Sequence, residues 1–308
     1  MTTAVFNTQA FRRHVTPPGH PEQVARHDAV QAALADLDLW RCDAPTADDA
    51  DILRCHPARY IDRVRATQPA TGWAQMDGDT YLSPESVNAA LSAVGGACAA
   101  VDAVLAGAAT NAFVPARPPG HHAERETAMG FCLFGTVAIA AKRALDHHGL
   151  SRVAIVDFDV HHGNGTQDLL WDEARCFFAS SHQMPLYPGT GSASEQGAHG
   201  QILNVPLREG SGGGVMRAAY EALIFPALLA WRPDLILISA GFDAHTDDPL
   251  AGLDWQTDDY TWLTHRICDL ADQVCAGRVV SCLEGGYDLA ALQASVAAHA
   301  GVLQERGR

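Results

Sequence analysis

The sequence predicts an α/β fold, in which a single domain over residues 1–308 builds a mostly parallel, multi-stranded sheet sandwiched between helices. Short β-branched or aromatic runs alternate with longer segments of helical period, the order typical of such sheets. The runs are almost continuously apolar, as expected for strands that are covered on both faces. Polar residues follow the runs directly, at the strand ends where α/β sheets bind their ligands.

These patterns predict the individual elements, with right-handed crossovers between the strands. Strands are expected at Ala112–Pro115, Val153–Asp157, Cys176–Ser180, Leu235–Ser239 and Val279–Leu283. Helices are expected near Glu22–Asp36, Pro84–Leu105, Phe131–His147, Gly214–Ala230, Asp258–Cys275 and Leu289–Leu303. Ser83 before Pro84 predicts an N-cap followed by a first-turn proline. No internal repeat or long linker divides the chain.

The net charge of this chain argues against two classes of binding partner, nucleic acids and anionic membranes. Its 308 residues include 21 basic and 36 acidic side chains, which gives a net charge of −15 with the 15 histidines neutral. Nucleic-acid binding depends on Lys and Arg contacts to phosphate, so this balance argues against a nucleic-acid partner. An anionic membrane surface is disfavoured for the same reason. The apolar share of 47% is enough for a sizeable core.

Three further patterns favour a cytoplasmic protein. Met1–Ala10 shows no basic region followed by an apolar one, so no secretory signal is expected. The most membrane-like stretch, Ala89–Thr110, is rich in Ala and Gly and contains Asp102, which favours a packed helix over a membrane span. The eight cysteines form no C-x-x-C pair, so we expect mostly buried, reduced thiols rather than disulfides or a Cys zinc site.

Four predicted strand ends deliver histidines, carboxylates and a phenol to one edge of the sheet. The segments are Arg117–His122, Asp157–Gly165, Ser239–His245 and Glu284–Asp288. A His-His pair alone means little, because a third pair at 147–148 stands at an expected helix end, where imidazoles suit the helix dipole. The pairs at 121–122 and 161–162 differ from it, since each follows a buried strand and has polar neighbours.

One strand end has the spacing of a metal site. Asp157, Asp159 and His161 stand at i, i+2 and i+4, which places them on one face of an extended segment. Asp159 and His161 can then reach one cation together, and Asp243 from another strand end can complete the set. One imidazole and two carboxylates with open positions are typical of a catalytic metal site. The set suits Zn²⁺, with Fe²⁺ and Co²⁺ as alternatives.

The motifs R-P-P-G-H-H, D-F-D-V-H-H-G-N-G-T-Q, S-A-G-F-D-A-H-x-D-D-P-L and E-G-G-Y-D-L resemble the active-site motifs of the zinc-dependent histone deacetylase family. Asn164 and the run Met129–Cys132 are most similar to its class II and bacterial deacetylase-like branch. The resemblance runs in the family's order from about His20 to Leu289. It implies the arginase–deacetylase fold and an amidohydrolase that removes acetyl or related acyl groups from lysine side chains of proteins or peptides.

The resemblance implies a metal ion and an oxyanion donor. By it, Asp159, His161 and Asp243 bind one Zn²⁺ per chain, which polarises the amide carbonyl and activates water. Tyr287 matches the phenol that donates a hydrogen bond to the developing oxyanion. Some relatives carry a histidine at this position and have poor deacetylase activity, so the tyrosine favours an active deacetylase.

The resemblance also assigns the proton-transfer groups. His122 is expected to act as general base and acid, with His121 as its electrostatic partner. Asp157 and Asn164 match the groups that orient these two imidazoles. Because an Asp raises the pKa of its histidine and an Asn does not, the two imidazoles should differ in basicity.

A substrate tunnel is implied in the same way. Gly130, Phe131 and Tyr187 resemble the walls of the narrow tunnel that takes a linear acyl-lysine side chain. Two aromatic faces over an aliphatic stem suit such a slot. The usual partner of Phe131 is another Phe, so Tyr187 is a departure that makes the mouth more polar. Leu250 stands where polyamine-specific relatives carry an acidic gatekeeper.

The family's inner potassium site is implied as well. Asp157 and Ser180 would supply side-chain oxygens to a structural K⁺. Asp159, His161 and Ser181 would supply backbone carbonyls. The two serines are also compatible with a plain polar strand end.

Three alternatives stay open. The runner-up substrate is an acetylated polyamine or other small acyl-amine, which a chain of charge −15 would attract. Asp79 and Glu85 precede a predicted helix, either near the tunnel rim or as ordinary solvated acids, while Leu250 and a short N-terminal loop argue against that substrate. A ureohydrolase on the same fold would need two metals, and a non-catalytic acyl-lysine reader would keep the pocket without chemistry. The sequence also leaves acyl length and homo-oligomer formation open.

Overall fold

The main sheet joins eight strands in the order β2-β1-β5-β10-β9-β6-β7-β8, and every neighbouring pair is parallel. The computed structural model describes residues 2–308. Its strands are β1 (Thr3–Asn7), β2 (Trp40–Asp43), β5 (Asn111–Val114), β6 (Val153–Asp157), β7 (Cys176–Gln183), β8 (Ile202–Leu207), β9 (Leu235–Ala240) and β10 (Val279–Leu283). A separate antiparallel pair consists of β3 (Ala74–Gln75) and β4 (Tyr81–Leu82).

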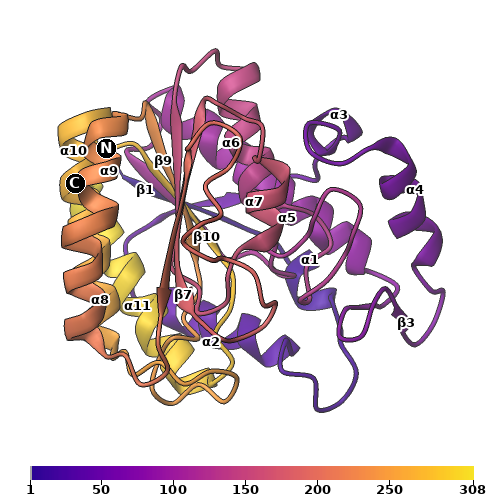
Figure 1. The fold of residues 1–308 in the computed structure, drawn as a ribbon. Coiled ribbons are helices and arrows are strands. Elements are labelled where there is room, and N and C mark those ends of the chain that lie inside the picture. The colour runs from indigo at the N-terminus through magenta and orange to yellow at the C-terminus, as the bar shows by residue number, and fades with distance from the viewer. Residues whose placement is uncertain (1) are drawn as a thin grey trace.

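Helices cover both faces of this sheet (Figure 1). On one face lie α8 to α11, and on the other lie α5, α6 and α7. The helices are α1 (Ala10–Arg13), α2 (Val24–Leu34), α3 (Asp49–Ile52), α4 (Ala58–Thr67), α5 (Ser86–Leu105), α6 (Thr136–Asp146), α7 (Asn164–Leu169), α8 (Gly213–Ala219), α9 (Phe225–Trp231), α10 (Thr257–Cys275) and α11 (Leu289–Arg306), with the π-helical turn η1 (Tyr220–Ile224) between α8 and α9. The predicted α/β fold is therefore confirmed.

The strands are apolar throughout because each one faces two cores. In β5, Ala112 and Val114 belong to the core under α5 and α6, while Phe113 between them belongs to the core under α10 and α11. In β6, Ile155 likewise belongs to the core under α5 and α6, and Val156 belongs to the core under α10 and α11. Successive side chains of a strand point to opposite faces, so a sheet covered on both sides needs apolar residues at every position.

The differences from the predicted elements lie at the sheet edges and at helix starts. All five predicted strands are present as β5, β6, β7, β9 and β10, but β1, β2, β8 and the short pair of β3 and β4 were not predicted. Strand β2 is mostly exposed and β8 contains Pro206, so neither shows the apolar run of an inner strand. The short helices α1, α3, α4 and α7 also lack a long periodic pattern and were not predicted.

Two predicted helix starts were wrong. Helix α5 begins at Ser86, and Glu85 rather than Ser83 holds the N-cap position. The backbone N–H of Ser83 instead donates to Ser86 Oγ over 2.7 Å, which makes a turn before the helix. Helix α6 begins at Thr136 rather than Phe131, because the intervening residues form a turn against the candidate site.

Burial agrees with the expectations for the apolar stretches and the cysteines. Within residues 2–308, two helices are long and apolar enough to cross a membrane, Ser86–Leu105 and Gly213–Trp231, but core helices of soluble proteins also meet this criterion. The first of them is 78% buried inside the protein, as expected for a packed helix. All eight cysteines are free, and all except Cys42 are buried.

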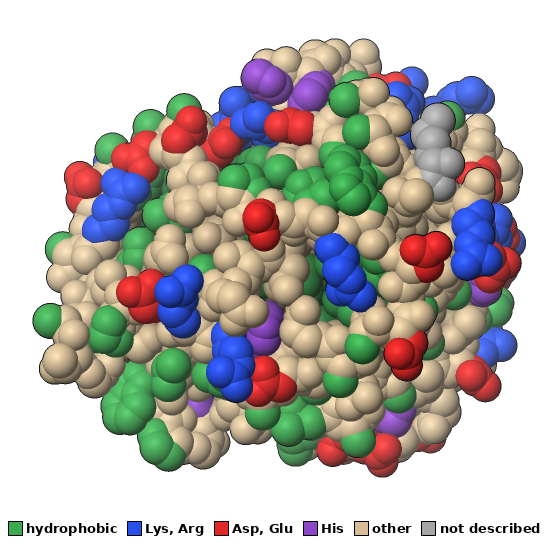
Figure 2. All heavy atoms as spheres, turned by 180° about the vertical axis from the view of Figure 1, so that it is seen from behind, with side chains coloured by type: hydrophobic (Ala, Val, Ile, Leu, Met, Phe, Trp, Pro, Cys, Tyr) green, Lys and Arg blue, Asp and Glu red, His purple; other side chains and the backbone are tan. Residues whose placement is uncertain are grey.

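Charged groups of both signs are interspersed over the face seen in Figure 2, which also shows apolar patches between them. Many of the exposed acids form ion pairs, such as Asp28 with Arg12 over 2.9 Å and Glu221 with Arg266 over 2.9 Å. The face seen in Figure 2 thus carries mixed charges rather than a single acidic field.

Candidate metal centre and active site

Four neighbouring strands bring the predicted polar segments together. β5, β10, β9 and β6 are adjacent in the sheet, and all run parallel. Their carboxyl ends therefore meet at one edge, which is where ligands bind in α/β sheets. The segments that follow these strands are those that contain His121, Glu284, Asp243 and Asp157.

Asp159, His161 and Asp243 form a buried cluster at this edge, with one potential ligand atom from each lying within 4.8 Å of the others. His161 Nδ1 lies 3.1 Å from Asp159 Oδ1 and 3.2 Å from Asp243 Oδ2. The imidazole makes its hydrogen bond to Asp159. Asp243 Oδ2 is a buried carboxylate oxygen that has no hydrogen-bond partner within residues 2–308. An unpartnered buried carboxylate oxygen beside a second carboxylate and an imidazole fits a divalent metal.

The backbone curls at this point rather than continuing as an extended segment. Strand β6 ends at Asp157, and the Asp157 Oδ1 atom accepts the backbone N–H of Asp159 over 3.1 Å. Asp159 Oδ1 then accepts the N–H of His161 over 2.9 Å. Two successive bonds from an Asp side chain to the N–H two residues on form local turns. The prediction of an extended segment is wrong beyond residue 157, but these turns still bring Asp159 and His161 together.

Backbone donors from other strand ends fix both carboxylates. The N–H of Gly285 donates to Asp159 Oδ2 over 2.8 Å, and the N–H of Val160 donates to Asp243 Oδ1 over 2.9 Å. A Cβ atom at Gly285 would overlap Asp243 Oδ2. Only glycine lets the backbone approach the carboxylates this closely, which explains the glycine in the E-G-G-Y motif.

His121 lies behind the cluster and is paired with a carboxylate. Its Nδ1 atom lies 3.0 Å from Asp157 Oδ2, and its Nε2 atom lies 3.7 Å from Asp159 Oδ2. Its backbone N–H donates to Glu284 Oε2 over 3.1 Å, and that oxygen also accepts from Gly120 over 2.6 Å. Burial lowers the pKa of His121, but the Asp159 and Asp157 carboxylates outweigh burial and raise this pKa well above its ordinary value.

His122 has an amide partner instead of a carboxylate. Its Nδ1 atom lies 2.7 Å from Asn164 Oδ1, and its ring centroid lies 4.0 Å from that of His121. Burial and the neighbouring imidazoles of His121 and His161 hold the pKa of His122 well below its ordinary value. The two adjacent histidines therefore differ in basicity in the expected direction.

Tyr287 is held from two sides. The guanidinium carbon of Arg26 lies 5.0 Å from the centre of the Tyr287 ring, and Arg26 also donates to the carbonyls of Glu284 and Gly286, each over 2.6 Å. The backbone N–H of Tyr287 donates to Asp248 Oδ2 over 2.7 Å. Burial raises the pKa of Tyr287 well above its usual value, so the phenol keeps its proton at neutral pH.

A cavity of about 250 Å³ connects these groups with the surface. Its lining combines chemical groups with apolar and aromatic walls: Asp79, His122, Gly130, Phe131, His161, Tyr187, Leu250 and Tyr287. All four predicted tunnel residues lie on it, and so does Asp79. Glu85 does not, because it lines a separate surface hollow with Arg12 and Trp73.

The wall at Gly130 and Phe131 has an unusual backbone. Both residues have positive φ angles, +56° and +68°. A Cβ at Gly130 would overlap the His122 ring, so this position requires glycine. Phe131 has a Cβ and adopts the left-handed region at a cost of about 1–2 kcal/mol. Hydrogen bonds from the N–H of Gly130 to Asp79 and of Phe131 to Thr80 Oγ1 hold the turn in place.

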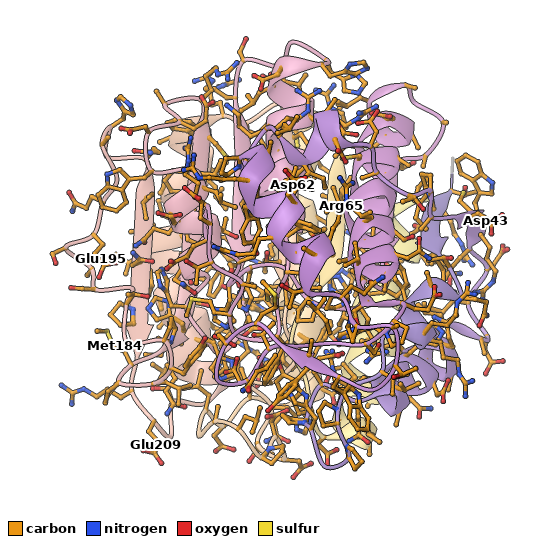
Figure 3. All side chains as sticks on the ribbon, turned by 90° about the vertical axis from the view of Figure 1, so that its right-hand side faces the viewer. Asp43, Asp62, Arg65, Met184, Glu195 and Glu209 are labelled. Carbon is orange, nitrogen blue, oxygen red and sulfur yellow. The ribbon has the colours of Figure 1, made fainter. Side chains whose placement is uncertain are left out.

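Tyr187 belongs to the long loop that follows β7, between the labelled residues Met184 and Glu195 in Figure 3. Its ring centroid lies 5.2 Å from that of His122 and 6.2 Å from that of His161. Glu195 closes the loop by accepting the backbone N–H groups of Gly191 and Ser192 over 3.0–3.2 Å. Tyr187 is 39% exposed, which places it at the mouth of the cavity.

Two of the residues predicted to bind potassium lie side by side, and that site stays a prediction. Asp157 and Ser180 are direct neighbours in the β6–β7 register. The hydroxyl of Ser180 shares a hydrogen bond with His182 Nδ1 over 2.9 Å, and that of Ser181 shares one with Tyr220 over 2.8 Å. Both hydroxyls are thus engaged with other side chains, including that of Ser180, which was predicted to supply a side-chain oxygen.

Sequence reasoning missed the residues that support the site from a distance. Arg26, Asp248 and Glu284 hold the segments of Tyr287 and His121, and Arg26 is separated from the carbonyl of Gly286 by 260 residues. Glu284 stands inside the E-G-G-Y-D-L motif, but its carboxylate contacts were not predicted. An arginine in the predicted helix Glu22–Asp36 gives no periodic signal of its burial, so Arg26 could not have been found from the pattern.

The parallel sheet, the buried Asp-His-Asp cluster and the histidines over a narrow cavity describe an α/β enzyme with a candidate metal centre. A sequence profile of the histone deacetylase domain matches residues 20–303. The chain therefore belongs to the histone deacetylase family, and the predicted deacetylase-type hydrolase and its family are both confirmed.

Individual relatives agree with this assignment. Histone deacetylase 10, chloroplastic, of Oryza sativa subsp. japonica is 41% identical over 90% of this chain and 68% of its own length. The histone deacetylase-like amidohydrolase of Pseudomonas aeruginosa is 42% identical over 79% of this chain and 65% of its own length. The crystal structure of the HDA15 HD domain covers 99% of this chain and 89% of its own, with a TM-score of 0.93 at 33% identity. This structural likeness confirms the expected arginase–deacetylase fold.

Proposed function

We propose that this protein is a zinc-dependent deacetylase that hydrolyses the amide bond of acetyl-lysine or related acyl-lysine side chains. The single observation that supports it best is the convergence of His122, His161 and Tyr287 on one narrow cavity. A candidate base, a candidate metal ligand and a candidate oxyanion donor all face the same space there. An amide at the inner end of the cavity would meet all three.

The metal would be held by Asp159, His161 and Asp243. Both carboxylates are already fixed by backbone N–H donors, and Asp243 Oδ2 lacks a hydrogen bond within the described chain. Zn²⁺ bound by these residues would serve as a Lewis acid for the amide carbonyl and for water near neutral pH. With three protein ligands, further coordination positions stay available to water or substrate.

The two histidines would divide the proton transfers. Because Nδ1 of His122 faces the acceptor Asn164 Oδ1, its Nε2 atom is free to take the proton of the attacking water. His121 beside Asp157 favours the protonated form and supplies a nearby positive charge. The proton held on His122 then passes to the leaving amine, which departs as the free lysine side chain.

Tyr287 would stabilise the charge that develops on the carbonyl oxygen. Its raised pKa keeps the phenol protonated, so that it can donate a hydrogen bond to the oxyanion. Arg26 and Asp248 fix the ring and its backbone, respectively, before the substrate arrives. A donor that is already in place needs no reorganisation during the reaction, which is why such groups accelerate it strongly.

The rest of the lining supports a linear acyl-lysine substrate. Phe131 and Tyr187 offer aromatic surfaces for an aliphatic stem, and Gly130 leaves room beside His122. Leu250 adds an apolar residue at the position of the acidic gatekeeper of polyamine-specific relatives. We propose acylated proteins or peptides as partners, the cytoplasm as the compartment and a structural K⁺ as a second ion.

An acetylated polyamine is the second candidate substrate because of Asp79. This half-buried carboxylate lines the cavity and would attract a cationic amine. Burial and the adjacent Asp77 raise the pKa of Asp79. Asp79 also accepts the N–H of Gly130 over 3.2 Å, so it serves the wall as well. The acyl-lysine substrate therefore remains the main proposal.

A substrate panel tests this proposal. The zinc-loaded enzyme is assayed against acetyl-lysine peptides, longer acyl-lysine peptides and acetylpolyamines, before and after metal chelation. We expect the highest kcat/KM on an acyl-lysine peptide, loss of activity on chelation and about one bound zinc per chain. Faster turnover of acetylpolyamines than of peptides would make a polyamine the substrate instead of acyl-lysine. Two bound metals per chain would indicate a ureohydrolase-like centre. Binding of acyl-lysine peptides without turnover would indicate a non-catalytic reader.

A further inference from the structure

Asn164 connects His122 to a carboxylate that none of the family motifs singled out. The amide nitrogen of Asn164 donates to Glu124 Oε1 over 2.8 Å, while its oxygen lies 2.7 Å from His122 Nδ1. Glu124 is partly buried in a tight turn, where its N–H and carbonyl pair with those of Thr127. The contact therefore forms a chain of three side chains, from His122 through Asn164 to Glu124.

This chain determines which way the Asn164 amide faces. A carboxylate can only accept hydrogen bonds, so the NH₂ group must be the end that points to Glu124. The sulfur of Met129, another acceptor, lies 3.4 Å from the same nitrogen. With both neighbours of the nitrogen being acceptors, the amide oxygen is left facing His122.

The amide orientation in turn determines the tautomer of His122. Opposite an amide oxygen, the Nδ1 atom of a neutral imidazole must carry the proton, which leaves Nε2 as the acceptor. If the amide turned over, its NH₂ would face Nδ1, and the proton would move to Nε2. A general base whose free nitrogen is already protonated cannot accept a proton from water.

We propose that Glu124 is a positioning residue, which acts through Asn164 to keep the proton of His122 on Nδ1. The inference rests on the proposed deacetylase function, where His122 is the general base. It assigns two arrangements to the adjacent histidines. His121 contacts its carboxylate Asp157 directly, whereas His122 is linked to its carboxylate through an intervening amide. An orientation is thereby imposed on His122 without a negative charge beside it.

Exchanging the side-chain functional groups of Glu124 and Asn164 tests this link. In Glu124→Gln the new amide can donate or accept, so the Asn164 amide is free to turn over. In Asn164→Asp two carboxylates face each other, which disfavours the arrangement. In the double variant, the new amide at position 124 would donate to the new carboxylate at position 164, and that carboxylate would accept from His122 Nδ1. An Asp at position 164 still accepts from His122 Nδ1, so the double variant restores the orientation that Glu124→Gln removes and relieves the repulsion that Asn164→Asp introduces.

A nearby residue provides the matched control. Glu126 lies in the same turn and pairs with Arg59, away from Asn164. Glu126→Gln removes the same charge two residues away and should leave kcat at the wild-type value. Glu124→Gln should lower kcat roughly tenfold with little change in KM, the low end for residues that orient an imidazole. The double variant should be faster than either single variant.

Nitrogen-15 NMR of histidine-labelled protein reads the tautomer directly. In the metal-free wild type we expect the His122 proton on Nδ1, and in Glu124→Gln a mixture of both tautomers. Unchanged kcat and an unchanged tautomer in Glu124→Gln would overturn the inference, and so would a double variant no faster than its singles. If the wild-type enzyme hydrolyses none of the acyl-amides, the proposed function is contradicted. The NMR measurement of the His122 tautomer would still test the role of Glu124 in that case.

Discussion

The inner wall and the rim of the cavity are built in different ways. At the inner wall, His161 lines the cavity and lies against the buried carboxylates of Asp159 and Asp243, which accept backbone N–H groups from neighbouring strand ends. The rim consists of Asp79 and Tyr187 on loops, and Tyr187 is 39% exposed. A parallel sheet fixes the ends of its strands, whereas its loops vary more freely. Under the proposed function, the reacting groups thus stand at the strand ends and the groups that select substrate stand on loops.

The largest expected effect comes from removing one tyrosine hydroxyl at the inner wall, compared with the same removal at the rim. Tyr287→Phe removes the donor next to the inner wall, and kcat should fall by roughly 10²–10³-fold, because a single oxyanion donor contributes about this much. The bound zinc, measured by elemental analysis, should stay at the wild-type level. Tyr187→Phe removes a hydroxyl at the rim and should change kcat by less than about threefold. Equal effects of the two variants would contradict the division.

A second prediction concerns His56, a buried histidine that contacts the segment containing Gly130 and Phe131 of the cavity wall. His56 Nδ1 donates to the carbonyl of Arg125 over 3.1 Å, and its Nε2 accepts the N–H of Gly135 over 2.9 Å. Burial lowers the pKa of His56 to about 4. The unfolded chain has the ordinary, higher value, so it binds a proton first as the pH falls, and the folded state loses stability between about pH 6.5 and pH 4.

The expected loss from His56 is about 3 kcal/mol across that range. Its stabilisation is complete above about pH 6.5 and disappears as the pH approaches about 4. Urea unfolding at several pH values measures it, with His56→Gln as the comparison, because glutamine can form both hydrogen bonds without titrating. The variant should lose less stability on acidification than the wild type. Parallel pH curves for the two proteins would show that His56 does not titrate as expected.

The smallest expected effect lies at the rim. Asp79→Asn keeps the acceptor for the N–H of Gly130 but removes the charge from the cavity wall. KM should rise about threefold for peptides with basic residues beside the acyl-lysine, as expected for a half-exposed charge. The increase should shrink at high salt and be absent for neutral peptides. A large fall in kcat would instead place Asp79 with the inner wall.

Particular residues show why the candidate site was predictable and its supports were not. Asp159 and Asp243 each follow an apolar run, and parallel strands carry their following residues to a common edge. Arg26 donates to the carbonyl of Gly286, which is 260 residues away in the sequence. Asn164 donates to Glu124, which is 40 residues away. Such contacts follow from packing between elements and leave no local pattern. The start of α5 was mispredicted because the Ser83 backbone bonds to Ser86 rather than capping the helix.

The sequence by itself determined the class of fold, the strand ends that carry chemistry and the resemblance to histone deacetylases, because burial on both faces and residue spacing are local properties of the chain. Only the tertiary structure decided which carboxylate oxygen stays unpartnered, which histidine pairs with a charge, and which loops form the cavity wall. Those features depend on distances between segments that are remote in sequence, and the packing of helices and loops on the sheet sets these distances.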